Sequence, residues 1–600
     1  MPALHSARRR PLRQRPRRLI WTRIALGIIV VAAISWVGVR GVLAKGELES
    51  AIPLSAEIQD QVLSGEGAAA VTTAREMSDH SARAAGLTSD PVWRAFEVVP
   101  LLGPNLIAVR QLAAVVDDVT QNAVLPLANV AGSVELSVFK PVDGAIGLTP
   151  LVEARPQFAA ADAALGAAMH QLATVDISAT HSAVRGAANR LANSLFNAAS
   201  AVRDMNRAVQ LVPNMLGASG PRNYLLLFQN PAELRATGGI PGAVALIHTE
   251  NGKIELAQQA SSSDFPFHEK PVLALPDETR GLYGDITGQY IQDVNLTPNF
   301  SLSALLAREM WTRQFGVEAD GVISIDPVAL SYLLKATGPI ALPSGEVINA
   351  DNAVQLLLRD VYARFENPAD QDKFFATAAE SVFSAVSSGS VDPVALVTAL
   401  NQAGSEHRVL VWSAHDEDQA VLKGTTLVGA LPVSDADATR FGVYLNDATG
   451  AKMGMYLDMQ IAVGQVTCRK DKRPNYGVSV TLSNIAPTDV ATLSDYVTGG
   501  GVYGVAPGNV KTVVSAYGAP GMQNLGMTRD DSVVAYHPAT DSSHPVSAIE
   551  VELVPGESTV LHFGWLGLEP SSAPVIAQST PVIHLNETRE LDLGCESALW

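Results

Sequence analysis

The first hydrophobic segment of the chain is an uncharged apolar run at residues 24–39, which resumes after Arg40. At about 1.5 Å of rise per residue, a helix over residues 24–44 spans the ~30 Å hydrocarbon layer of a bilayer. Trp21 and Trp36 lie where interfacial aromatic residues are expected, and the charge of Arg40 can reach the interface. The pattern therefore predicts one transmembrane helix at 24–44.

Residues 47–215 carry apolar side chains at helical spacing, with alanines that let helices approach closely. The longest seam runs from Val184 to Val209, and five prolines predict breaks into hairpins: Pro91, Pro100, Pro104, Pro126 and Pro156. The region is interpreted as a helical bundle or stalk that holds the rest of the protein off the membrane. A hairpin that packs on itself and self-association of two chains both fit the seam.

The pattern changes after Pro221 to short apolar runs that alternate with helical stretches. Strand-like runs occupy 224–228, 243–248, 253–259 and 321–325, and helical patterns occupy 302–315 and 327–336. Continuous apolar runs are typical of strands buried on both faces, and the Asn-Gly pair at 251–252 indicates a hairpin turn. The alternation predicts an α/β core over 218–455.

The last part of the chain, residues 456–600, contains short alternating or β-branched runs separated by turn residues. The runs lie at 456–466, 478–482, 510–515, 549–554 and 559–563. They predict a small antiparallel β-sandwich. The predicted fold class is therefore a multidomain chain with a single transmembrane helix, a helical membrane-proximal region, an α/β core and a C-terminal sandwich.

The basic residues are concentrated at the front of the chain. Ten of the 42 lie in residues 1–46, which contain no acid, so the rest of the chain has 60 acids against 32 bases. The arginines that precede the apolar run are Arg8, Arg9, Arg10, Arg13, Arg15, Arg17, Arg18 and Arg23. By the positive-inside rule they make residues 1–23 a cytoplasmic tail and place the bulk of this cell-membrane protein outside the cytoplasm. The alternative is a signal peptide cleaved near residue 44.

The acidic bulk repels polyanions, which excludes nucleic acid as a partner and favours divalent cations nearby. Both cysteines, Cys468 and Cys595, lie in the last quarter of the chain. In an oxidising exterior such a pair is expected to form a disulfide, and two unpaired buried thiols are the alternative.

The loop after the first core strand is the most suggestive candidate site. Gly238 and Gly239 allow close approach of a ligand, and Arg235 offers a bidentate fork for a phosphate or carboxylate. Thr237 belongs to the same loop, in which Glu233 can share a metal ion with Asp264 or orient the arginine. The alternative is a structural Arg235–Glu233 pair that braces a tight turn.

A second cluster contains Asp293 and Asn295, whose oxygen atoms two residues apart suit a hard divalent cation such as Mg²⁺. Asp293 is therefore the candidate metal ligand, and capping of the following helix is the alternative role for this segment. Arg308 and Arg313 follow on a predicted helix, where a separation of five residues makes them face different sides. Asp326, just before Pro327, is predicted to cap a helix.

Several motifs in the core resemble the bacterial family called domain of unknown function 4012. They are NYLLLFQN at 223–230, ELRATGG at 233–239, QDVN at 292–295 with Pro298 and Phe300, DGVISID at 320–326, TGP at 337–339 and NDATGAK at 446–452. The resemblance covers roughly half the chain. It implies an anchored protein, mostly from bacteria of Gram-positive type, and carries no established activity.

The core is more distantly similar to the LytR-CpsA-Psr family, through Arg235, the Gly252-Lys253 turn, residues 320–326 and residues 338–340. That similarity implies an extracytoplasmic, Mg²⁺-dependent transfer of glycans from polyprenyl pyrophosphate carriers to the wall, with Arg235 holding the pyrophosphate. The chain departs from that family at Thr237, where the family has an aspartate. The later Arg-Asp pair of the family has no clear counterpart, which puts catalysis in doubt.

Two functions are consistent with these features. The first is a cell-envelope protein whose core binds an anionic glycan or a ligand linked to polyprenyl phosphate, with phosphotransferase-type glycan ligation as the enzymatic form of that function. The second is a non-enzymatic scaffold for envelope assembly. The partners predicted from the sequence are the lipid bilayer and a polyprenyl-linked or wall glycan.

Overall fold

The computed structural model describes residues 17–133, 144–387, 391–584 and 586–596, so most of the predicted basic tail lies outside the described residues. The chain has several parts, is about half helical, and contains mixed sheets. It divides into two compact units, one of residues 1–136 with 150–209 and the other of residues 137–149 with 210–600. Each unit has hydrophobic clusters of its own.

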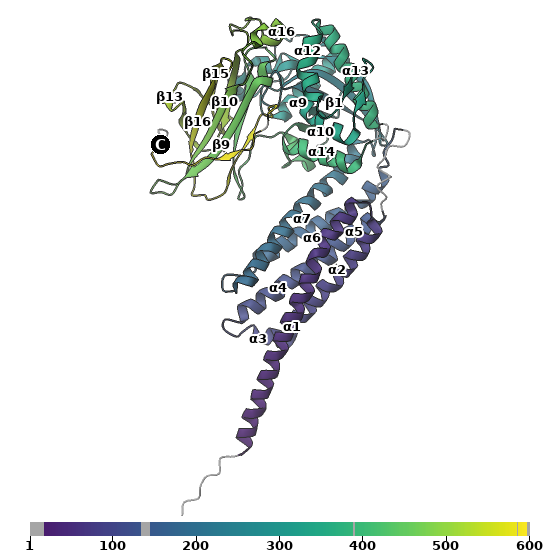
Figure 1. Ribbon diagram of the computed structural model, residues 1–600, viewed down its shortest axis with the longest axis vertical. Coiled ribbons are helices and arrows are strands. Elements are labelled where there is room, and N and C mark those ends of the chain that lie inside the picture. The colour runs from purple at the N-terminus through teal and green to yellow at the C-terminus, as the bar shows by residue number, and fades with distance from the viewer. Residues whose placement is uncertain (1–16, 134–143, 388–390, 585, 597–600) are drawn as a thin grey trace, which may run out of the picture. The chain divides into compact units, whose positions relative to one another are not determined.

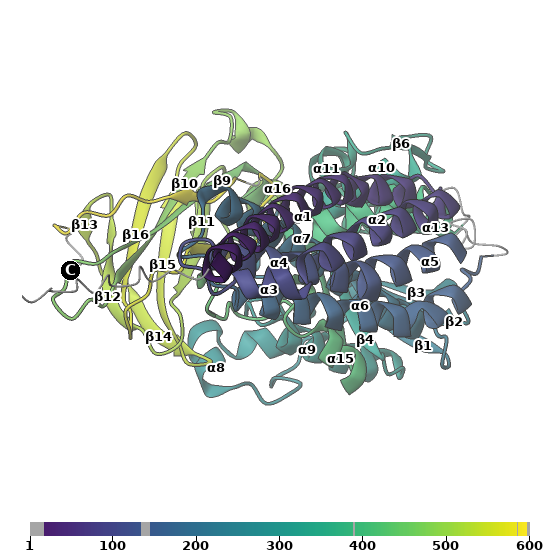
Figure 2. The same ribbon diagram turned by 90° about the horizontal axis from the view of Figure 1, so that it is seen from below.

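Helices build the first unit. They are α1 (Arg17–Leu63), α2 (Gly67–Thr88), α3 (Pro91–Phe96), α4 (Gly103–Val119), α5 (Leu125–Ser133), α6 (Thr149–Ala173) and α7 (Ser182–Met215), with a π-helical turn at Thr120–Val124. α1 and α2 lie side by side (Figure 1, Figure 2). Val119 of α4, Leu165 of α6 and Leu195 of α7 share one hydrophobic cluster. The predicted seams therefore pack against one another within a single chain.

Two of the five prolines lie in continuous helical stretches, where the sequence predicted breaks. Pro156 is inside α6, and Pro126 is the second residue of α5, which follows the π-helical turn directly. A proline in a helix interior costs about 3 kcal/mol, and tertiary packing of the helix overrides that preference here. The break predicted at each of these two positions was wrong. Pro91 and Pro104 instead stand at helix starts, where the missing N–H is harmless.

α1 is longer than the predicted span and continues into the bundle. Among the described residues, one helix is long and apolar enough to cross a membrane, at Trp21–Val62. Its large apolar side chains are exposed from Trp21 to Trp36, whereas Val37, Ala51 and Ile58 are buried against other helices. The first part of α1 is therefore free to lie in lipid, and the rest belongs to the bundle.

A five-stranded sheet is the centre of the α/β part of the second unit. Its order is β3 (Lys253–Ser261), β2 (Ile240–Glu250), β1 (Arg222–Asn230), β4 (Gly321–Ile325) and β7 (Val409–Ser413). β1 pairs in parallel with β4, and the other neighbours are antiparallel. Val322 and Leu410 face α9 (Phe300–Phe315), whereas Ile323 and Val411 face α10 (Pro327–Thr337) and α14 (Pro393–Ser405). Because successive side chains of a strand point to opposite faces, helices on both sides explain the continuous apolar runs.

Further elements complete this part of the unit. The helices are α8 (Asp277–Tyr283), α11 (Ala353–Gln355), α12 (Val361–Arg364), α13 (Pro368–Ser387) and α15 (Asp416–Leu422), and β5 (Ile340–Ala341) pairs with β6 (Val347–Ile348). α13 lies near the edge strand β3.

Two further sheets form the C-terminal part. The six-stranded sheet has the order β13 (Ser532–Val533), β12 (Gln523–Arg529), β16 (Ser558–Leu566), β10 (Asn475–Asn484), β9 (Leu457–Val466) and β18 (Arg589–Glu590). The five-stranded sheet has the order β14 (His537–Asp541), β15 (His544–Leu553), β11 (Val510–Tyr517), β8 (Thr439–Asp447) and β17 (Val575–Ser579). One hydrophobic cluster takes Val443 and Val514 from the smaller sheet and Ile461 and Phe563 from the larger.

These sheets are mixed, so the prediction of purely antiparallel pairing was wrong. β17 pairs in parallel with β8, and β18 pairs in parallel with β9. Both parallel strands come from the end of the chain and add to the outer edge of their sheets. Cys468 and Cys595 form a disulfide, with Cα atoms 5.6 Å apart, that joins this last segment to the loop after β9.

Candidate functional site

The loop between β1 and β2, residues 231–239, contains most of the predicted site residues. It is held as a tight turn by Gln229, whose Oε1 accepts from the Gly239 N–H at 3.1 Å and whose Nε2 donates to Thr237 Oγ1 at 3.3 Å. A Cβ atom at Gly239 would lie 2.0 Å from the Asn230 carbonyl oxygen, and Gly238 has a φ of +141°. Both glycines are therefore required by the turn itself.

Arg235 forms an ion pair with Asp293, not with Glu233. Its Nε and Nη2 atoms donate to Asp293 Oδ1 at 3.2 and 2.9 Å, and its Nη1 donates to the Leu234 carbonyl at 2.9 Å. The two side chains are 13% and 12% exposed. The structure thus unites two residues that the sequence placed in separate clusters, and the alternative of an Arg235–Glu233 pair was wrong.

Glu233 pairs instead with Lys452, at 2.6 Å between Oε2 and Nζ. The Lys452 ammonium lies 4.8 Å from the ring centre of Tyr362 and 4.4 Å from that of Tyr496, so two aromatic faces stabilise the cation. Burial acts to lower the pKa of Lys452, but Glu233, Tyr362 and Tyr496 together raise it and hold that pKa above its ordinary value. Lys452 therefore stays charged at neutral pH although it is buried.

Asparagine side chains tie the loop to the segments around it. Asn295 Nδ2 donates to the Gly239 carbonyl, and Asn446 Oδ1 accepts from the Ala236 N–H at 3.1 Å while its Nδ2 donates to the Leu296 carbonyl at 3.1 Å. Asn295 is 1% exposed, and its Oδ1 is buried without a hydrogen-bond partner. The loop, the 293–296 segment and the end of β8 therefore form one buried polar junction, which also includes Glu233 and Lys452.

The motifs at 223–230, 233–239 and 292–295 meet in this junction. Residues 219–362 match the family described as protein of unknown function (DUF4012). The match supports the predicted resemblance across these residues, the DUF4012 region. Asn446 and Lys452 contact that region from outside it. No curated protein matches the chain.

Asp447 is the titratable group of the junction that responds in the neutral pH range. Burial raises its pKa to about 6, although Thr449 and Gly450 donate three hydrogen bonds to its carboxylate. Arg235 acts to lower that pKa and Glu233 to raise it. The folded state therefore binds the Asp447 proton more tightly than the unfolded chain does. Protonated Asp447 contributes its full stabilisation of the folded state below pH 3.8, and this contribution is lost as the pH rises through about 6.

Asp447→Asn is expected to remove this pH dependence. The free energy of unfolding of the wild type, relative to that of the variant, should fall by about 3 kcal/mol between pH 3.5 and 7, since each pKa unit corresponds to ~1.4 kcal/mol. Urea unfolding of both proteins at several pH values measures the difference.

Asp471 is the matched control, because its exposed carboxylate accepts from Arg469, which holds its pKa at about 2. A carboxyl group whose pKa is lowered by folding stabilises the folded state only at pH values above its pKa in the unfolded chain. The free energy of unfolding of the wild type, relative to that of Asp471→Asn, should therefore not fall between pH 4 and 7. A difference for Asp447→Asn that is flat with pH would contradict the raised pKa.

Arg308 and Arg313 do not join the junction. Arg308 donates to the Ala319 carbonyl at 2.6 Å, and Arg313 donates to Glu309 and to the Val272 carbonyl, both at 2.7 Å. Arg313 lies about 20 Å along α9 from its first residue, since a helix rises ~1.5 Å per residue. The two arginines contact different partners and do not line one site, as their separation of five residues predicted.

The predicted metal ligands are engaged by protein groups. Asp264 Oδ2 accepts from the Ser261 N–H at 2.8 Å in a capping box, whereas Glu233, with which it was predicted to share a metal ion, pairs with Lys452. Across the described ranges no group of three or more His, Cys, Asp or Glu side chains is placed to hold a metal ion. Asp293 accepts from Arg235, so its role as a Mg²⁺ ligand rests on the sequence alone.

A second buried ion cluster is centred on Arg408, which sequence reasoning missed. Asp326 caps α10 as predicted, accepting from the Ala329 N–H at 2.7 Å, and its other oxygen accepts from Arg408 Nη1 at 2.8 Å. Arg408 Nε donates to Glu406 at 2.7 Å and Nη2 to the Val582 carbonyl at 2.6 Å. Its side chain is 0% exposed. The one signal in the sequence was a charged residue directly before the apolar run of β7.

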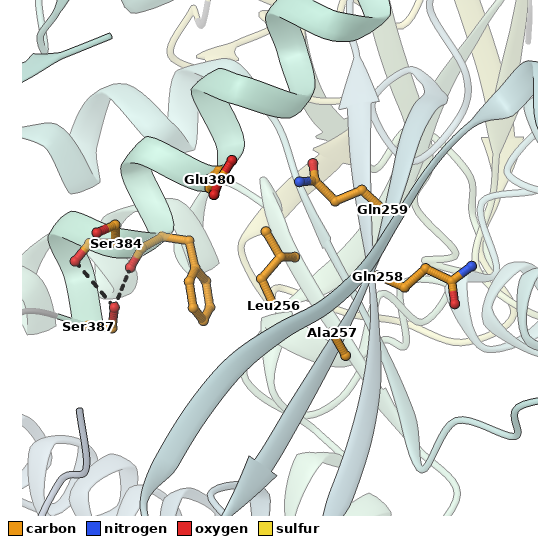
Figure 3. A pocket seen from close by; sticks show the side chains of 8 residues that line it. Leu256, Ala257, Gln258, Gln259, Glu380, Ser384 and Ser387 are labelled. Carbon is orange, nitrogen blue, oxygen red and sulfur yellow. Dashed lines mark hydrogen bonds between the residues drawn. The ribbon is translucent and has the colours of Figure 1, made fainter. Parts of the chain in front are cut away.

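An open pocket of about 490 Å³ lies between β3 and α13, in a different place from the junction. Leu256 and Gln259 line it from β3, and Glu380, Ser384 and Ser387 line it from α13 (Figure 3). The lining has amides, hydroxyls, apolar side chains and one carboxylate but no cation. This chemistry suits a neutral polar or apolar segment and does not suit a phosphate.

Proposed function

We propose that the protein is a single-pass membrane protein of the cell envelope that acts as an interaction scaffold outside the cytoplasm. The exposed apolar part of α1 supports the anchor, and the arginine-rich tail supports a cytoplasmic N-terminus. The disulfide is compatible with an oxidising exterior. In this proposal the bundle carries the α/β and C-terminal parts, which present their surfaces to other envelope components.

The observation that carries the proposal is the state of Arg235. All three of its guanidinium nitrogens donate to protein oxygens, two of them to a carboxylate that already balances its charge. Around it, the acids Glu233, Asp293 and Asp447 outnumber the bases Arg235 and Lys452. A polyphosphate would add negative charge to a junction in which a carboxylate already binds its proton more tightly than usual.

The pocket beside β3 is the surface that we favour for a partner. β3 is the edge strand of its sheet and is bridged by Ala145 at its first residue, Lys253. An edge strand can pair with an extended peptide through its outward backbone groups. Leu256 and Phe383 offer apolar contacts there, and the amides of Gln258 and Gln259 offer hydrogen bonds. The proposed partner class is therefore an extended polypeptide segment.

The second candidate is a LytR-CpsA-Psr-like function, in which the core binds an anionic glycan or polyprenyl-phosphate ligand, with Mg²⁺ in its transferase form. Asn295 supports the Mg²⁺-dependent form, because its buried Oδ1 has no hydrogen-bond partner and is the kind of oxygen that Mg²⁺ binds. This proposal includes a LytR-CpsA-Psr-like fold for the α/β part. The core shared by the C-terminal sheets supports a β-sandwich in either case. Self-association through the helical region also stays a proposal.

Ligand binding by the full chain in nanodiscs separates the two functions. Farnesyl phosphate, a short polyprenyl phosphate, is titrated with and without Mg²⁺ into wild type, Arg235→Ala and the matched control Arg313→Ala. The scaffold proposal expects no saturable binding to any of the three. It is overturned if the wild type binds saturably and Arg235→Ala weakens that binding by about tenfold or more, as loss of a charge-assisted contact would, while Arg313→Ala does not. Unfolding curves must show that Arg235→Ala is folded.

A further inference from the structure

The turn between α3 and α4 exposes an unusual run of apolar side chains. We call residues 98–102 the 98–102 turn. Within it the side chains are exposed to 84% at Val98, 89% at Leu101, 42% at Leu102 and 37% at Val99. The remaining residue of the turn is Pro100, so the turn carries no charge. Leu101 has a φ of +68°, a conformation uncommon for leucine, and its side chain points away from the adjacent core into solvent. Adjacent exposed apolar side chains of this kind mark a contact surface.

The turn lies where α1 leaves the bundle. Val37 of α1 shares a cluster with Trp93 of α3 and Leu106 of α4, and Trp93 Nε1 donates to the Leu106 carbonyl at 3.1 Å. Arg40 pairs at 2.8 Å with Asp90, the residue that caps α3. Both views show α3 beside α1 at this end of the helical unit (Figure 1, Figure 2).

The length of α1 places the same end at a membrane surface. From Trp21 to Arg40 the helix is about 30 Å long, which equals the thickness of a hydrocarbon core. Arg40 also donates to the Leu87 and Gly86 carbonyls at the end of α2, so its charge is held at the boundary of the bundle. A bilayer around the exposed part of α1 therefore ends close to Arg40, at the level of α3.

We propose that the 98–102 turn inserts into the headgroup region of the bilayer that α1 spans, as a second membrane contact. The inference rests on the membrane anchoring proposed above. Lipid is the expected partner of the turn because α3 and Arg40 connect the turn to the helix that enters the membrane. Two contacts, unlike one helix alone, fix the tilt of the bundle relative to the membrane plane.

The neighbouring loop between α6 and α7 provides a comparison within the same unit. It is joined to the start of α4 by a hydrogen bond of 2.7 Å from the His181 N–H to Asn105 Oδ1. It exposes the polar residues Thr174, Asp176 and Ser178 instead of a run of large apolar ones. Ala179 is an exposed position in this loop and makes a matched control for Leu101.

Fluorescence of the full chain in vesicles of phosphatidylcholine and phosphatidylglycerol tests the inference. An environment-sensitive nitrobenzoxadiazole probe is attached to Leu101→Cys, Val98→Cys, Ala179→Cys or Ile29→Cys, while the native cysteines stay in their disulfide. Quenching is compared between nitroxide lipids labelled near the headgroup and aqueous iodide. At positions 98 and 101 the lipid quencher is expected to act at least about threefold more strongly than at position 179, as for an interfacial insertion.

The position in α1 separates the two proposals. If the probe at Ile29 is protected by lipid but probes at Val98 and Leu101 behave like the one at Ala179, the insertion is wrong and the anchor stands. If the probe at Ile29 is open to iodide, the anchor is wrong and the insertion with it. A blue shift at position 101 that grows with protein density and lacks nitroxide quenching identifies a second copy of the chain as the occupant and overturns insertion into lipid.

Discussion

Replacing Arg408 with methionine is expected to lower the free energy of unfolding of the second unit by about 3–5 kcal/mol, the loss typical of a broken buried ion pair. Methionine fills a similar volume but leaves the buried carboxylate of Asp326 without its cation and Glu406 with one fewer donor. The Val582 carbonyl also loses its donor. Urea unfolding of the full chain, followed by tryptophan fluorescence, measures the change.

Arg469→Met is the matched control for Arg408→Met. Arg469 pairs with Asp471 at 2.8 Å, but both side chains are nearly half exposed, so its loss is expected to stay below about 1 kcal/mol. Adding Asp326→Asn to Arg408→Met should recover part of the loss, because asparagine still caps α10 and carries no charge. A loss for Arg408→Met as small as that of the control would show that the pair does not hold the fold.

Replacing Lys452 with methionine is expected to lower the free energy of unfolding by about 3 kcal/mol or more. The side chain of Glu233 is 13% exposed and would lose its only salt-bridge partner among the described residues. The rings of Tyr362 and Tyr496 would lose the cation between them. Since the pKa of Lys452 lies above its ordinary value, this destabilisation should be constant from pH 6 to 9. Denaturant unfolding at both pH values measures it.

Lys511→Met provides the control for Lys452→Met, because Lys511 pairs at 2.8 Å with Glu550, whose side chain is 53% exposed. That variant is expected to change stability by less than about 1 kcal/mol. The double variant Glu233→Gln with Lys452→Met should be more stable than Lys452→Met alone, since it leaves no unpaired charge. Equal effects of Lys452→Met and Lys511→Met would contradict the role given to the junction.

These variants also determine how a change at Arg235 is interpreted. Arg235→Ala would leave the Asp293 carboxylate largely buried without its partner, so a loss of stability is expected even if no ligand binds. Binding data for that variant are informative only beside its unfolding curve. The same reasoning applies to any cellular phenotype of the variant.

The elements that the sequence predicted correctly are those whose apolar pattern is local. Residues 321–325 form β4, the run at 224–228 lies within β1, and the helix predicted at 302–315 lies within α9. The strand β7 was missed although Val409–Trp412 is a continuous apolar run, because so short a run cannot be assigned to a strand by periodicity alone. β8 was missed as well, since the sequence of Thr439–Asp447 ends in the polar Asn446 and Asp447 that bind the junction.

The site was predicted in composition but not in pairing. The sequence singled out Glu233, Arg235, Asp293 and Asn295, and the structure brings all four into one junction. Glu233 and Arg235 have opposite charges and are two residues apart, but they do not pair with each other. Glu233 pairs with Lys452, and Arg235 pairs with Asp293. Lys452 lies 219 residues from Glu233, and no local spacing indicates that contact.

The sequence alone determined the apolar helix near the N-terminus, the acidic character of the rest, the helical seams, and the order of β1 to β4 with α9 and α10 in the core. These follow from periodicity and composition, which act over a few residues. Only the tertiary structure decided that Arg235 is neutralised by Asp293, that Arg408 is fully buried, and that strands from the end of the chain complete the C-terminal sheets. These pairings depend on which groups from distant parts of the sequence are buried together. A buried charge without a partner raises the free energy of the folded state, so each buried charge has to lie beside a partner that balances it.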